Sequence, residues 1–139
     1  MNSRLNCITL PVSDLKASLT FYRHGLGLPT DDIGELTDAD DHVALKLEGG
    51  LYLVLILRAG FAEFTTLAQQ AEAPPGVSEC VLSYFATSQT EVDEILQHCA
   101  ANGGSVAGQP VAQPWGYAGY VKDPDGHLWE IMFNPKMNA

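Results

Sequence analysis

The segment GHLWEIMF at 126–133 decides the fold, because it repeats the form of GLYLVLIL at 50–57. In each segment a glycine ends a turn and large apolar residues follow, which is typical of a strand buried on at least one face. Laid glycine on glycine, the segments differ at Val54 and Glu130, where an isopropyl group in one corresponds to a carboxylate in the other. The repeat predicts two copies of one structural unit, and an acid within an apolar run needs a physical reason.

The residues upstream of both segments extend the repeat. NCITLPVSD precedes LKASLTFYRHGLG, and ECVLSYFATS precedes QTEVDEILQHCAANGG, so each half starts as strand, cap and helix. Apolar residues recur at helical spacing in both halves; they are Leu15, Leu19, Tyr22 and Leu26 in the first and Val92, Ile95, Leu96 and Cys99 in the second. We predict a strand, a helix and three strands in each half, and aligning the helix caps places Cys7 opposite Val81.

Turn and cap signals mark the boundaries of these elements. Ser13 or Asp14 begins the first helix, and Ser88 followed three residues later by Glu91 has the spacing of a capping box. KDPDGH joins the last two strands of the second half, and EGG does the same in the first half. These signals predict a single domain with a first module at about 5–57, a connecting segment at 58–76 and a second module at about 77–134.

Length and composition favour a compact protein. The chain has 139 residues, of which 46% are hydrophobic, and no apolar run reaches the ~20 residues that a membrane-spanning helix needs. The N-terminus lacks the pattern of a signal peptide, so we expect a cytoplasmic location. Cys7, Cys80 and Cys99 form an odd set without CxxC spacing, which predicts reduced thiols rather than a disulfide framework.

The charge balance argues against two classes of partner. The chain has 7 basic and 17 acidic residues, and its Lys and Arg residues do not cluster, so neither nucleic acid nor a membrane surface is an expected partner. The acids concentrate in DDIGELTDADD at 31–41. Because this segment lacks the glycine and glutamate positions of a helix-loop-helix calcium site, we interpret it as a solvated loop.

Three stretches of the chain resemble a known family. TLPVSDLKASLTFYRHGLGL, VLSYFATSQTEVDEILQHCAANGG and, above all, WGYAGYVKDPDGHLWEIMFNP are similar to the vicinal oxygen chelate superfamily, the group of glyoxalases, bleomycin-resistance proteins and extradiol dioxygenases. The resemblance implies an α+β fold in which two βαβββ modules form a curled mixed sheet around a cleft, usually in a homodimer. Metal enzymes of this family place a His on the first strand of each module and a carboxylate on the last.

Carrying this ligand pattern over to the chain gives an incomplete set. The four positions fall on Cys7, Val54, Val81 and Glu130, and the two valines cannot bind a metal. We therefore expect no metal and no other cofactor, and a small-molecule ligand as the partner. The alternative is a divalent ion held by Cys7 and Glu130, with Glu79 as a third ligand if the strand register shifts.

Glu130 is the leading candidate for function. It can serve as a general base or bind a polar ligand by hydrogen bonds, whereas the alternative is a structural acid satisfied by neighbouring donors. Cys7 is either a small apolar residue on a strand or a nucleophile, which would need a cation or His nearby. The residues predicted to line a binding site with Glu130 share its expected strand phase or supply aromatic surface; they are Thr9, Tyr52, Val54, Val81, Ser83, Trp115 and Tyr117.

Three functions of different classes are compatible with these residues. We favour a small-molecule binding protein of the resistance type, because half of the expected ligand set is aliphatic. The second is a lyase, isomerase or dioxygenase-type enzyme that uses Glu130 as base or metal ligand. The third is a structural or regulatory dimer whose cleft is filled by side chains. Membership of a fold family does not choose between them.

Overall fold

The structure, a computed structural model, describes residues 1–137, which form two sheets and three α-helices. The first module contains β1 (Cys7–Val12), α1 (Leu15–Thr20) with its π-helical continuation η1 (Phe21–Gly25), β2 (His42–Lys46), the 3-10 turn η2 (Glu48–Gly50) and β3 (Tyr52–Leu57). Helix α2 (Arg58–Leu67) follows directly. The second module contains β4 (Val81–Phe85), α3 (Gln89–Ala101), β5 (Ser105–Gln113), β6 (Gly116–Lys122) and β7 (Leu128–Phe133).

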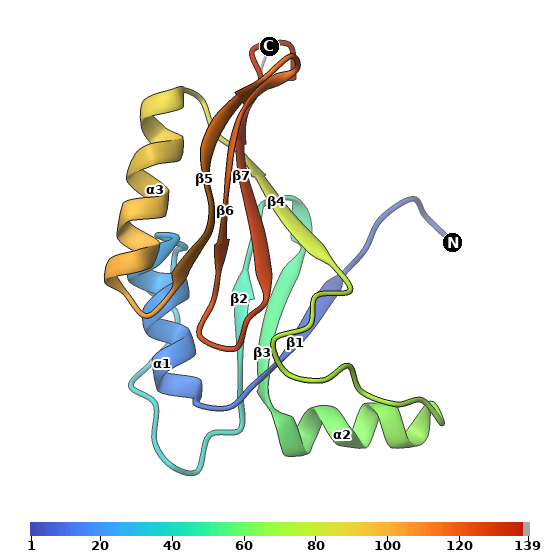
Figure 1. The fold of residues 1–139 in the computed structure, drawn as a ribbon. Coiled ribbons are helices and arrows are strands. Elements are labelled where there is room, and N and C mark those ends of the chain that lie inside the picture. Colours follow the sequence, from blue (N-terminus) through green and yellow to red (C-terminus); the bar gives the residue numbers. More distant parts are fainter. Residues whose placement is uncertain (138–139) are drawn as a thin grey trace.

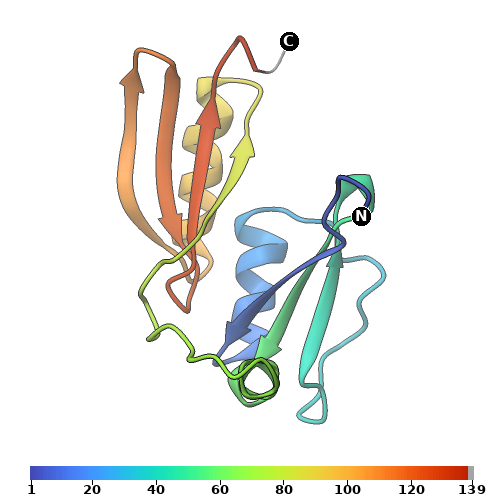
Figure 2. The same cartoon turned by 90° about the vertical axis from the view of Figure 1, so that its right-hand side faces the viewer.

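The two sheets have related topologies. Their strand orders are β1-β3-β2 and β4-β7-β6-β5. In the first sheet β1 runs parallel to β3, and in the second β4 runs parallel to β7. Helices α1 and α3 cover one side of the sheets (Figure 1). In the view turned by 90°, β1 and β4 are the edges that face each other, and the connecting segment passes below them (Figure 2). This arrangement is the predicted α+β fold of two modules.

One predicted strand is missing from the first module. The sequence predicts three strands after its helix, but only β2 and β3 follow, and residues 26–41 contain no strand. The acid-rich segment within this stretch lacks the apolar alternation that would let it extend the sheet. The first module therefore has three strands where the second has four.

The register confirms the predicted repeat. Thr9 pairs with Val54 in the first module, and Ser83 pairs with Glu130 in the second, so the alignment of the two modules holds at the level of paired residues. The glycines that anchor the alignment, Gly50 and Gly126, both have positive φ values, of 81° and 90°. This conformation favours glycine, which explains why both turns end on that residue.

Helix caps and the core also follow the predicted pattern. The Asp14 carboxylate accepts the N–H of Ala17, and the Ser88 hydroxyl accepts the N–H of Glu91. Side chains from both modules form one core. The predicted helical stripes lie in or against this core, with Leu26 and Ile95 only partly buried. A shared core means that the two modules stabilise each other.

Buried polar contacts join the modules as well. The Tyr22 hydroxyl donates to Asp123 Oδ2 at 2.7 Å and accepts from Trp129 Nε1 at 3.3 Å. Burial raises the pKa of Asp123, and both burial and this carboxylate raise the pKa of Tyr22. Asp123 Oδ1 accepts two backbone N–H groups of the β6–β7 turn, those of Asp125 and His127. A tyrosine of the first module thus fixes the turn of the second.

Among the helices formed by residues 1–137, none is both long and apolar enough to span a bilayer.

Candidate functional site

The face of the sheets opposite α1 and α3, here called the open face, carries most of the predicted site residues. On β7 the side chains of Trp129 and Ile131 are buried in the core, so the alternating residue Glu130 points the other way. Met132, in phase with Glu130, is buried outside the main core cluster. Glu130 is therefore half-buried at the centre of a mainly apolar strand face.

Two hydroxyl groups bind the Glu130 carboxylate. Ser83 Oγ on β4 donates to Oε1 at 3.0 Å, and the Tyr120 hydroxyl on β6 donates to Oε2 at 2.8 Å. Both donors are the register partners of Glu130 on the neighbouring strands. The bond to the carboxylate raises the pKa of Tyr120, with burial as a second cause. We call Ser83, Glu130 and Tyr120 the Glu130 trio.

The Glu130 carboxylate retains acceptor capacity beyond these two bonds. An ionised carboxylate offers about four lone-pair positions, and the trio uses two of them. Within residues 1–137 no Lys, Arg or His forms an ion pair with Glu130. The arrangement can accept hydrogen bonds from a bound molecule and can favour a positive charge at that point.

The equivalent positions of the first module contain no carboxylate. Thr9 and Ala44 are the register partners of Val54, as Ser83 and Tyr120 are those of Glu130. Thr9 Oγ1 lies 3.5 Å from Cys7 Sγ rather than contacting an acid. The hydrogen-bonded carboxylate of the second module therefore has no counterpart at the equivalent position of the first.

Cys7 lies on the open face without an activating partner in the described part of the chain. The thiol is exposed, and its one hydrogen-bond contact there is with Thr9. Tyr52, its register partner on β3, is 40% exposed, and Val81 is 50% exposed on the edge strand β4. These three residues offer surface for contact, but in residues 1–137 no acid or histidine forms a hydrogen bond with the Cys7 thiol.

The structure does not bring Trp115 and Tyr117 together with Glu130. The Tyr117 hydroxyl donates to Asp93 Oδ1 of α3 at 2.7 Å, so this side chain lies on the helix side of the sheet. Trp115 lies at the tip of the β5–β6 hairpin, where it lines a shallow hollow with Tyr117 and Phe133. Tyr117 and Tyr120 are three positions apart on β6, so their side chains point to opposite faces of the sheet. Tyr120 therefore lies on the face of Glu130, and Tyr117 does not.

The sequence analysis did not identify Tyr120 as the donor to Glu130. A signal for this contact exists in the turn KDPDGH, because β6 and β7 pair symmetrically about Asp125. Counting five residues outward from Asp125 in each direction reaches Tyr120 and Glu130. Hairpin symmetry therefore identifies the donor that strand phase alone misses.

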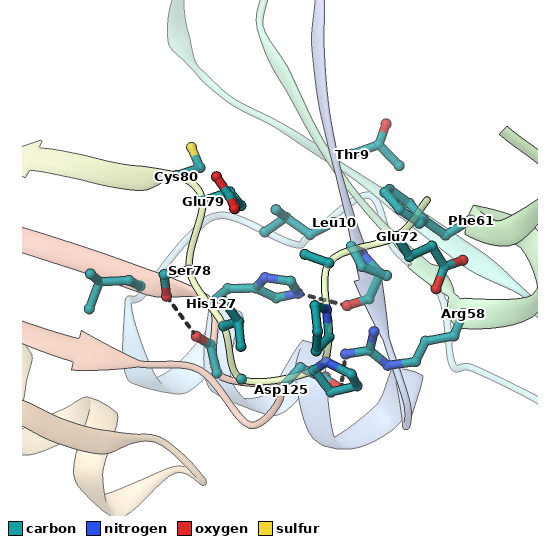
Figure 3. A pocket seen from close by; sticks show the side chains of 18 of the residues that line it. Thr9, Leu10, Arg58, Phe61, Glu72, Ser78, Glu79, Cys80, Asp125 and His127 are labelled. Carbon is teal, nitrogen blue, oxygen red and sulfur yellow. Dashed lines mark hydrogen bonds and ion pairs between the residues drawn. The ribbon is translucent and has the colours of Figure 1, made fainter. Parts of the chain in front are cut away.

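A cavity of about 210 Å³, here called the junction pocket, lies where the modules meet (Figure 3). β1, α2, the connecting segment and the start of β7 all contribute to its lining. Arg58 Nη2 lies 3.3 Å from Asp125 Oδ1, and Arg58 Nε donates to Ser13 Oγ. His127 Nε2 lies 2.7 Å from the carbonyl oxygen of Pro11. Sequence reasoning missed this pocket, because its lining comes from segments far apart in the chain.

The side chains do not form a metal site of the expected kind. Across residues 1–137 no group of three or more His, Cys, Asp or Glu side chains is placed to hold an ion. Two of the four family positions are valines, and Glu79 precedes β4 instead of continuing its strand phase. The donor set therefore does not fit a catalytic divalent cation.

Comparisons with known proteins agree with this architecture. The family model described as Glyoxalase/Bleomycin resistance protein/Dioxygenase superfamily matches residues 4–131. No curated protein matches the chain significantly. A glyoxalase-related enzyme from Fulvimarina pelagi shares 29% identity with a TM-score of 0.77, covering 96% of this chain and 89% of the other. A lactoylglutathione lyase from Agrobacterium tumefaciens, at 23% identity and a TM-score of 0.67 with 99% and 97% coverage, shows likeness of fold.

Proposed function

Since the chain belongs to the glyoxalase, bleomycin-resistance and dioxygenase superfamily, we propose that it binds a small organic molecule on the open face, around Glu130 and without a catalytic metal. The observation that carries this proposal is the Glu130 trio. Two neutral hydroxyl donors hold a carboxylate on an apolar strand face, and its charge is not compensated by an ion pair with a described residue. A carboxylate without a cation on an apolar strand face needs a physical reason, and ligand binding supplies one.

The proposed mechanism of binding uses only side chains of the chain. Ser83 and Tyr120 fix the orientation of the carboxylate, so its remaining lone pairs are presented to a ligand without a loss of side-chain freedom on binding. The neighbouring apolar residues Leu128 and Met132 exclude water from one side of the bound molecule. Thr9, Tyr52, Val54 and Val81 are proposed as further contact surface.

The experiment for this proposal combines metal analysis with ligand detection. Protein purified without added metal should contain no stoichiometric divalent ion and should show no glyoxalase activity when nickel or zinc is added. Native mass spectrometry and a thermal-shift screen of small organic molecules should find compounds that bind the protein. One bound metal per chain, with activity that a chelator removes, would contradict the proposal.

A metal-independent lyase or isomerase is the second candidate. The observation in its favour is the same half-buried carboxylate, which can accept a proton from a carbon acid if the ligand presents one. Turnover of a bound compound by the wild-type protein, lost in Glu130→Gln, would favour the enzyme over the binding protein.

We further propose that the protein forms a homodimer and acts in the cytoplasm. Edge strand β4 exposes large apolar side chains on both of its faces, with Tyr84 42% and Phe85 41% accessible. An exposed apolar edge favours association with a second copy. Light scattering should report a dimer at micromolar concentration, and a particle of 15.0 kDa would contradict this proposal.

A further inference from the structure

The junction pocket has an apolar wall that fits the body of a small molecule. Side chains from five segments contribute to this wall; they include Leu10, Phe61, Val77, Leu82 and Leu128. Figure 3 shows Phe61 and Glu72 on one side of the pocket and Glu79 and Cys80 on the other, with His127 between them. A cavity of about 210 Å³ accommodates one aromatic ring with a short chain rather than a large cofactor.

One residue belongs both to the lining of the pocket and to the strand face of Glu130. Leu128 lines the pocket and lies two positions before Glu130 on the same face of β7. Two positions along a strand correspond to roughly 7 Å. A molecule with its ring in the pocket can therefore reach the carboxylate with a chain of a few atoms.

The charges around this path favour a positive ligand. Arg58 is the one Lys or Arg residue in the pocket lining, and its guanidinium is already paired with Asp125. Glu72 and Glu79 also line the pocket, and neither forms a hydrogen bond or ion pair with a residue of the described chain. The pocket and the trio thus present several carboxylates without compensating cations.

A second basic residue, besides Arg58, lies close to this path. Lys122 is the register partner of Leu128 on β6 and occupies the same sheet face, but it forms no ion pair with Glu130 among the described contacts. The Glu130 charge is therefore left for a ligand. Lys122 also defines the opposite hypothesis, in which an acidic ligand binds, and the experiment must include that case.

We propose that the ligand is a small organic amine, protonated at neutral pH, whose apolar ring fills the junction pocket and whose ammonium group binds the Glu130 carboxylate. This inference rests on the proposed function, because it names the chemical class of the molecule bound at that site. The ammonium group donates to the lone pairs that Ser83 and Tyr120 leave free. The phenyl ring of Phe61 packs against the apolar part.

The experiment uses three probes of one shape and different charge. Calorimetric titration of the intact protein at pH 7 compares 3-phenylpropylamine, 3-phenylpropanol and 3-phenylpropanoate. We expect the amine to bind tightest, with the alcohol weaker by about tenfold or more and the acid weaker again, since a hydrogen bond to a charged group contributes that much to affinity.

Matched variants separate the two parts of the site. Glu130→Gln should lower the affinity for the amine to near that of the alcohol, whereas Glu94→Gln, on the exposed side of α3, should leave both unchanged. Phe61→Ala should weaken amine and alcohol alike, whereas Phe64→Ala on the same helix should change neither, because Phe64 does not line the pocket. If Phe61→Ala lowers the melting temperature strongly, Phe61→Leu takes its place.

Each outcome decides the inference. Equal binding of amine and alcohol, both weakened by Phe61→Ala, would overturn the charge assignment and leave the proposed function intact. Tightest binding of the acid would overturn it in favour of Lys122. Absence of binding by all three probes would also overturn it, while the screen and native mass measurement described above decide the proposed function separately.

Discussion

The two modules share one backbone plan but differ in the side chains at the centre of the open face. Three paired positions correspond between them; Ser83, Glu130 and Tyr120 of the second module stand where the first has Thr9, Val54 and Ala44. The first module keeps an apolar strand there, and the second holds a hydrogen-bonded acid. The first module forms the same strand pairing without an acid at this position. This difference is the basis of our proposal that Glu130 serves binding or chemistry.

The modules also differ at the helix position that contacts the partner module. Aligned on the caps Asp14 and Ser88, Tyr22 of the first module corresponds to Leu96 of the second. Tyr22→Phe should destabilise the protein by about 2–4 kcal/mol, because it leaves buried Asp123 Oδ2 and Trp129 Nε1 without their partner. Chemical denaturation measures this change.

The matched control for that variant is Tyr117→Phe, which removes a partly exposed hydroxyl bonded to Asp93. We expect a loss of less than about 1 kcal/mol there. Equal losses in the two variants would show that the buried Tyr22 hydroxyl contributes no more to stability than the partly exposed Tyr117 hydroxyl.

Introducing an acid into the first module tests directly whether the difference between the modules matters for stability. Val54→Glu should destabilise by about 1–3 kcal/mol, because Thr9 is the one hydroxyl among its register partners. Adding Ala44→Tyr supplies the counterpart of Tyr120 and should recover about 1 kcal/mol. A double-mutant cycle measures the coupling, and a coupling of zero would show that the hydroxyl on the neighbouring strand does not stabilise the acid.

The turns of the two modules differ in their response to pH. Burial raises the folded-state pKa of Asp123 in the second turn, whereas the first turn, EGG, contains no buried acid. The contribution of Asp123 to stability is therefore fully present below the pKa of this carboxyl in the unfolded chain, which is about 4. It is lost as the pH rises through the raised folded value.

The free energy of unfolding of the wild type, relative to Asp123→Asn, should therefore increase as the pH is lowered from 7 toward 4. Denaturation curves at several pH values test this sign. A relative stability that falls on acidification would show that the hydrogen bonds to Asp123 outweigh its burial.

A buried hydroxyl distinguishes the helices of the modules. Ser18 lies four residues after its cap, as Val92 does in the second helix, and its Oγ is buried without a hydrogen-bond partner among the described residues. Ser18→Ala should stabilise the protein by up to about 1 kcal/mol. A loss of stability in thermal denaturation would show that this hydroxyl has a role in packing.

The repeat allowed much of the fold to be predicted from the sequence. Aligning Gly50 with Gly126 aligned β3 with β7, because in both modules a glycine turn precedes an apolar strand. The structure agrees, since both glycines have positive φ values. The third strand after the helix of the first module was a wrong prediction, since the number of strands was taken from the second module and residues 26–41 form no strand.

The site was less predictable than the fold. Strand phase placed Ser83 beside Glu130, but it did not give the partner on β6, because that requires the register of the hairpin. The junction pocket depends on the packing of α2 and the connecting segment against the β6–β7 turn. Local patterns carry no information about such contacts between distant segments.

The measurement that tests the central claim most directly is the comparison of stability and ligand binding in Glu130→Gln. The variant should fold and should keep its free energy of unfolding within about 1 kcal/mol of the wild type, because an amide can still bond to Ser83 and Tyr120. It should lose binding of the compounds that raise the melting temperature of the wild type, while Glu94→Gln retains it. A destabilisation of roughly 1–3 kcal/mol with binding intact would show instead that Glu130 is a structural acid.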